Sequence, residues 1–166
     1  MKFILMICAS IIGTLACYAQ QEQKIGVDGL ELGMKSQDAV FVIGTMQGFK
    51  LDDKQENESA YYLCYYKKGF QSNILQYTLY FDKTQDKAFA IEKLYLAGDN
   101  RYFVQNTYQS RYADMLYKYG NPIVKDETSS VWRLKEYKIT LAWVVFPFNN
   151  GITIYGIREF YEHIFE

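Results

Sequence analysis

The sequence predicts an α+β fold built from two tandem units, each a helix followed by an antiparallel sheet. Two segments with helical spacing of apolar residues each precede three segments rich in β-forming residues. An acidic polar stretch separates the helix from the strands in both halves. The chain is 49% hydrophobic and contains 16 tyrosines, a composition typical of a packed core with partly wet sheet faces. We expect the first unit to span residues 20–99 and the second to span residues 100–166.

Residues 1–19 are predicted to be an export signal. The apolar run at residues 3–12 follows a lysine and is too short to span a membrane, and we expect no transmembrane span elsewhere. Two processing routes stay open. Small residues favour cleavage after Ala19, which would leave Gln20 at the new N-terminus. Alternatively, residues 15–17 resemble a lipobox, in which case Cys17 would be lipidated and would anchor the protein.

The first unit is predicted to open with residues 25–33. Apolar and polar residues alternate there around glycines, as in a short edge strand or an extended lead-in. Ser36 is a good helix N-cap, and Gly44 can adopt the left-handed conformation that ends a helix. An acidic polar loop is predicted over residues 51–59. Three strands follow, at residues 60–66, 74–81 and 88–96.

The second unit is predicted to open with a longer helix that begins at Arg101 or Thr107 and ends at Tyr119. Gly120 and Pro122 stop it, because proline cannot continue a helix. Its buried face is predicted to carry Val104, Tyr108, Tyr112, Met115, Leu116 and Tyr119. After an acidic loop, three strands are predicted at residues 131–137, 139–146 and 152–161, with a turn at 149–151 between the last two.

A short motif around the first helix resembles a known family. Gly33 and Met34 precede the helix, and Gly44 and Thr45 end it. This pattern resembles the SmpA/OmlA family of small envelope lipoproteins, which includes the BamE component of the outer-membrane barrel-assembly machinery. Met46 stands where that family has proline. Length and element order are also similar to the β-lactamase inhibitory protein fold, which binds proteins on a concave sheet surface. Both resemblances imply protein binding without catalysis.

Charge and residue chemistry narrow the function classes. The formal net charge is −1, which argues against nucleic acid as a partner. The only histidine, His163, lies near the C-terminus, and Cys64 lies mid-strand, where a free cysteine is typically a small buried apolar group. The acidic residues 52–58 lack the spacing of a calcium loop. We therefore expect no catalytic residue, no metal site and no cofactor, and a protein that is not an enzyme.

The aromatic strands give the remaining functional prediction. Tyr62 and Tyr66 share one face of the strand at 60–66, and Trp143 lies in a strand that is apolar on both faces. Packing between the two units is the simpler explanation of apolar residues on both faces of a strand. The other explanation is that a partner binds there, because Tyr and Trp are enriched at interface hot spots. We predict that Tyr62, Tyr66 and Trp143 contact a partner.

The sequence therefore favours an exported, non-enzymatic binding or assembly protein of the bacterial cell envelope. It would be periplasmic or associated with the outer membrane, and its partner would be an envelope protein. Two alternatives stay open. One is a glycan hydrolase that uses two carboxylates facing one cleft. The other is a sugar- or peptide-binding module that uses the tyrosines.

Overall fold

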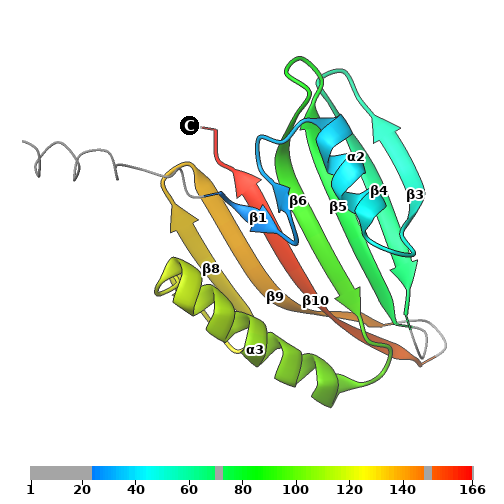
Figure 1. Cartoon of the computed structure of the whole chain (residues 1–166). Coiled ribbons are helices and arrows are strands. Elements are labelled where there is room, and N and C mark those ends of the chain that lie inside the picture. Colours follow the sequence, from blue (N-terminus) through cyan, green and yellow to red (C-terminus); the bar gives the residue numbers. More distant parts are fainter. Residues whose placement is uncertain (1–23, 70–72, 148–150, 166) are drawn as a thin grey trace, which may run out of the picture.

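The structure, a computed structural model, describes residues 24–69, 73–147 and 151–165. Within them, eight strands form one antiparallel sheet with the strand order β3-β4-β5-β6-β10-β9-β8-β7 (Figure 1). The predicted export signal at 1–19, its candidate lipidation site Cys17 and most of the predicted turn at 149–151 lie outside the described residues. The strands are β3 (Lys50–Glu56), β4 (Ala60–Lys68), β5 (Ile74–Asp82), β6 (Lys87–Leu96), β7 (Val124–Lys125), β8 (Ser129–Leu134), β9 (Tyr137–Pro147) and β10 (Thr153–His163).

The predicted α+β fold of two tandem helix-plus-sheet units is wrong. The described chain is mostly β, and its eight main strands form a single sheet. Strand β6 pairs antiparallel with β10, from Ala90 opposite Glu162 to Leu96 opposite Gly156, and this pairing joins the strands of both halves. Hydrophobic alternation identifies a strand but does not identify its neighbour, so the sequence could not predict this pairing.

The predicted acidic loop at residues 51–59 is also corrected. Lys50–Glu56 form strand β3 and pair with β4, with a bulge between Leu51 and Asp53. Strand β3 lies at the edge of the sheet. Charged side chains and bulges are the usual means by which an edge strand avoids pairing with another chain. The acidic composition therefore marks an exposed edge strand, and it was mistaken for a loop.

The longer of the two described helices, α3 (Arg101–Tyr119), has a clear cap at each end. The Asn100 side chain accepts a hydrogen bond from the Phe103 backbone N–H at 2.9 Å. Gly120, at φ 77°, ends the helix as predicted. The predicted face is confirmed, because the buried residues are Val104, Tyr108 and Met115 and the half-buried ones include Tyr112, Leu116 and Tyr119.

The boundaries of the shorter helix, α2 (Ser36–Thr45), differ from the prediction. Ser36 is not the N-cap; it lies within the helix, and its hydroxyl donates to Asp86 Oδ2 at 3.0 Å. Gly44 is helical and does not stop the helix. The contact with Asp86 therefore ties the start of α2 to the turn before β6, a tertiary role that a capping rule does not consider.

Residues 25–33 form a small hairpin of their own. Its strands are β1 (Gly26–Val27) and β2 (Leu30–Glu31), and it lies between α2 and α3 on the same face of the sheet (Figure 1). The turn places Asp28 and Gly29 at positive φ, 53° and 84°. An Asp-Gly pair is favoured in such tight turns, because both residues tolerate this conformation. The hairpin thereby covers the sheet where neither helix reaches.

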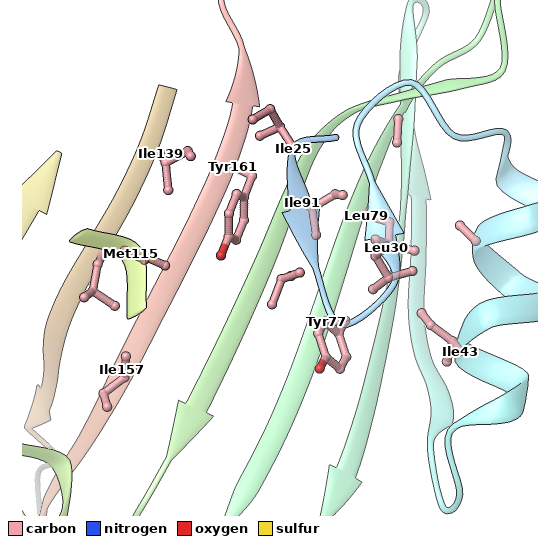
Figure 2. Close-up of a cluster of buried hydrophobic side chains, with 14 of the residues drawn as sticks. Ile25, Leu30, Ile43, Tyr77, Leu79, Ile91, Met115, Ile139, Ile157 and Tyr161 are labelled. Carbon is pink, nitrogen blue, oxygen red and sulfur yellow. The ribbon is translucent and has the colours of Figure 1, made fainter. Parts of the chain in front are cut away.

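The hydrophobic core lies on the face that carries both helices and the hairpin, which we call the helix face (Figure 2). The opposite face is called the open face. A row of directly opposed residues crosses the sheet on the helix face, and each is at most 8% exposed: Leu63, Leu79, Ile91, Tyr161, Ile139 and Trp132. Full burial of an apolar side chain of this size contributes about 1.5–3 kcal/mol. The apolar burial that stabilises the fold therefore lies mainly on one side of the sheet.

Asp28 ties the hairpin to the sheet. Its carboxylate accepts hydrogen bonds from the Lys93 ammonium, 2.6 Å from Oδ2, and from the Tyr77 hydroxyl. Burial opposes ionisation of Asp28, but these hydrogen bonds outweigh it and hold the pKa of the carboxyl below its usual value. Because the folded-state pKa is lowered, the contact stabilises the fold above the unfolded-state pKa. That stability is lost as the pH falls through the folded-state pKa.

Asp28→Asn should therefore lower stability at neutral pH but not in strong acid. Asparagine tolerates positive φ, so the substitution removes the charge and keeps the turn. We expect a loss of about 1 kcal/mol in the free energy of unfolding at neutral pH, a value discounted for the partial exposure of Asp28. Urea unfolding from neutral pH down to about pH 2 measures this loss, and the two proteins should converge at the acid end. A loss independent of pH would contradict the assignment.

Candidate functional site: the open aromatic face

The open face carries the side chains that alternate with the core residues. Tyr62 on β4 lies opposite Tyr80 on β5, and Tyr80 lies opposite Ala90 on β6, so all three point to this face. Phe160 on β10 lies opposite Glu92 on β6 and points the same way. Among the described residues, both helices and the hairpin pack on the other side. The open face is thus a surface to which strands of both halves contribute.

Four aromatic rings from adjacent strands form a connected group, which we call the open-face cluster: Tyr62, Tyr80, Phe89 and Phe160. The ring centroid of Tyr80 lies 5.8 Å from that of Tyr62, 6.2 Å from Phe89 and 6.3 Å from Phe160. The Tyr80–Phe160 contact is edge-to-face, an arrangement that aromatic pairs prefer. All four side chains are only half-buried. Their rings therefore remain accessible to another apolar surface.

An ion pair lies beside the cluster. Arg158 Nε is 2.5 Å from Glu92 Oε1, although the two groups are not aligned as a hydrogen bond. The Tyr80 hydroxyl donates to Glu92 Oε2 at 3.4 Å, and the Arg158 guanidinium lies 4.9 Å from the Phe160 ring centroid. Burial and the Glu92 charge raise the pKa of Tyr80 to about 12, so its hydroxyl is a donor at neutral pH. The site combines apolar rings with charges of both signs.

The structure brings together two of the three predicted partner residues. Tyr62 and Tyr66 both lie on the open face of β4, where the Tyr62 hydroxyl donates to Asp53 Oδ2 at 2.9 Å. Trp143 lies on the helix face instead. The Arg101 guanidinium is 5.4 Å from its ring centroid. Trp143 therefore does not contribute to the surface that carries the two tyrosines.

Sequence reasoning missed the other members of the cluster. Tyr80 follows Gln76 and Thr78 at a spacing of two along its strand, and both of these were predicted to point away from the core. The same alternation would have placed Tyr80 on that face. Phe89 had no such signal. The β5–β6 register shifts between Tyr80 and Phe81, and the extra residue on β6 is Phe89, whose ring contacts Tyr80. A bulge of this kind is invisible to a period-two pattern.

Cys64 lies between Tyr62 and Tyr66 on the open face of β4. It is 6% exposed, and the Thr78 hydroxyl donates to its sulfur at 3.8 Å. Burial raises the pKa of the thiol, so the sulfur stays protonated at neutral pH. Its setting is that of a small buried apolar group beneath the tyrosines.

No group of three or more His, Cys, Asp or Glu side chains among the described residues could hold a metal ion. His163 Nε2 lies 3.5 Å from the Glu136 carboxylate at the end of β10. No helix in the described ranges is long and apolar enough to cross a membrane.

Comparisons with protein-family models, with curated proteins and with solved structures gave no match. The resemblances to the SmpA/OmlA family and to the β-lactamase inhibitory protein fold therefore stay predictions. The geometry of the open face is therefore what supports it as a candidate site.

Cys64 offers a probe of packing on the open face. With Cys8 and Cys17 replaced by serine, it is the only thiol in the chain. We expect the folded protein to react with an aromatic disulfide reagent more than about tenfold more slowly than the urea-unfolded chain, because the sulfur is buried and its pKa is raised. Tyr62→Ala should speed the reaction, and Tyr117→Ala, at a tyrosine 95% exposed on α3, should not. Equal rates for folded and unfolded protein would show that the face is not packed as described.

Proposed function

We propose that the protein is an exported, non-enzymatic binding or assembly protein of the bacterial cell envelope, and that it contacts a protein partner through its open face. The observation that carries the proposal is the open-face cluster, whose half-buried rings come from four adjacent strands. An antiparallel sheet can leave one face to water, but that face then carries mainly polar residues. Grouped aromatic rings there are typical of a surface that another molecule covers.

The chemistry around the cluster favours a protein as that molecule. Tyr and Arg are enriched among the residues that dominate binding energy at protein interfaces, and Tyr62, Tyr66 and Arg158 all lie on this face. The Glu92–Arg158 pair supplies one charge of each sign beside the rings. An apolar centre with polar groups around it is the usual anatomy of a protein interface. We expect the partner surface to have the complementary pattern.

The envelope location rests on the sequence. The predicted signal at residues 1–19 supports export, and the motif at residues 33–45 supports an envelope role through its resemblance to the SmpA/OmlA family. Lipidation of Cys17 would distinguish a membrane-anchored protein from a free periplasmic one. Either form would present the same open face to a partner.

Photocrosslinking in the native envelope tests the proposal. A photoreactive phenylalanine analogue at Tyr66 probes the open face, and the same analogue at Tyr117 probes the helix side of the molecule. We expect an envelope protein to be crosslinked from Tyr66 and not from Tyr117, and mass spectrometry identifies it. Crosslinks from both positions, from neither, or only to another copy of this chain would contradict the proposal.

The affinity of the identified partner then gives the quantitative test. Tyr62→Ala and Tyr66→Ala should each raise the Kd about 30-fold, because hot-spot residues contribute about 2 kcal/mol or more. Tyr117→Ala is the matched control and should leave the Kd unchanged. Circular dichroism confirms that each variant is folded. Equal affinities for all three folded variants would remove the open face as the binding surface.

A further inference from the structure

A groove of about 340 Å³ lies on the helix face, on the opposite side of the sheet from the open-face cluster. Three directly opposed residues form its floor, Leu75 on β5, Tyr95 on β6 and Ile157 on β10. This volume is within the range of small-ligand sites, roughly 300–1,000 Å³. The wall is one side of α3, with residues spaced four apart along the helix: Phe103, Thr107 and Arg111.

Charged residues also line this groove. Lys93 on β6 and Glu159 on β10 are directly opposed across the β6–β10 pairing. Glu159 is 3% exposed, and Arg111 holds it with Nε 2.7 Å from Oε1 and Nη2 2.9 Å from Oε2. The Tyr161 hydroxyl donates to Oε2 at 2.8 Å. Each oxygen of Glu159 therefore already accepts at least one hydrogen bond.

The two cations, in contrast, keep unused donors. An ammonium carries three N–H groups, and the hydrogen-bond partner that the described residues provide for Lys93 is Asp28 Oδ2, at 2.6 Å. A guanidinium carries five N–H groups, and Arg111 directs donors to Glu159 and to Asp114. The Lys93 side chain is only 19% exposed, so its free donors have limited access to water. The groove thus offers unused N–H donors on two cations.

We propose that this groove binds the carboxylate of a small amphipathic ligand. The carboxylate accepts hydrogen bonds from Lys93 and Arg111, and the apolar part lies on Leu75, Phe103 and Ile157. Three carboxylates, Asp28, Asp114 and Glu159, contact the two cations and leave no net positive charge. Selectivity for a carboxylate therefore comes from the spare N–H donors. A medium-chain fatty acid and a short apolar peptide with a free C-terminus share this chemistry. The inference is independent of the proposed partner site, because it uses the other face of the sheet.

Methyl NMR of the full chain tests the proposal with defined ligands. Sodium octanoate and N-acetyl-leucyl-leucine represent the two sources, and octanol, octylamine and N-acetyl-leucyl-leucine amide lack the carboxylate. We expect saturable shifts of the Leu75 and Ile157 methyl signals and none of Leu94, which lies on the open face. The ligands without a carboxylate should bind at least about tenfold more weakly. Binding of octanoate alone or of the peptide alone identifies the source.

Variants locate the site. Thr107→Phe fills the groove from α3, and Gln109→Phe places the same ring on the exposed side of that helix as a matched control. The first should weaken binding of the carboxylate at least about tenfold, and the second should leave it unchanged. Lys93→Gln should weaken binding about tenfold in a chain that circular dichroism shows to be folded.

Four results would overturn the proposal. They are no binding of either carboxylate to the wild type, equal binding of octanol and octanoate, shifts at Leu94 in place of Ile157, and equal affinities of the Thr107→Phe and Gln109→Phe variants. None of these results depends on the partner of the open face, so either proposal can be refuted without the other.

Discussion

The pairing of β6 with β10 is the contact on which the rest of the structure depends. It runs from Ala90 opposite Glu162 to Leu96 opposite Gly156 and joins the strands of both halves in one sheet. A Cβ at Gly156 would lie 2.7 Å from the Tyr95 carbonyl oxygen, so the close approach of the two strands requires glycine there. Because the sheet is continuous, α2 and α3 cover the same face, and the hairpin fills the space between them (Figure 1).

The same pairing positions a group of charged side chains, of which Glu159 is buried. Lys93 and Glu159 oppose each other across it, Arg111 reaches Glu159 from α3, and Asp28 reaches Lys93 from the hairpin. Each of these two covering elements is therefore held to the sheet by a charged contact as well as by apolar burial. Glu159 is buried, and leaving a buried charge without its partner costs about 3–5 kcal/mol, so its contact with Arg111 ties α3 to one place on the sheet. The charged contacts also create the polar end of the groove.

Local patterns predicted the elements well and their assembly poorly. Alternation reports which residues face a core, and it placed Tyr62 and Tyr66 on one face of their strand. The face of Trp143 relative to those tyrosines depends on the register of every strand between β4 and β9, which no local pattern contains. The position of Phe89 was not predicted because it lies in a β-bulge. Strand β3 was not predicted because a charged edge strand has the composition of a loop. The predicted two-sheet fold was the largest error and concerns strand pairing, whereas the boundaries of α2 were a local error.

Amide hydrogen exchange tests the joined sheet most directly. If β6 and β10 pair as described, the amides around Lys93 and Glu159 lie in the centre of a continuous sheet and exchange only on global unfolding. Their protection free energy should then equal that of the amides of Leu79 and Ile139, in the strands on either side. Two sets of amides with different protection, and fast exchange along the facing edges of β6 and β10, would contradict the account.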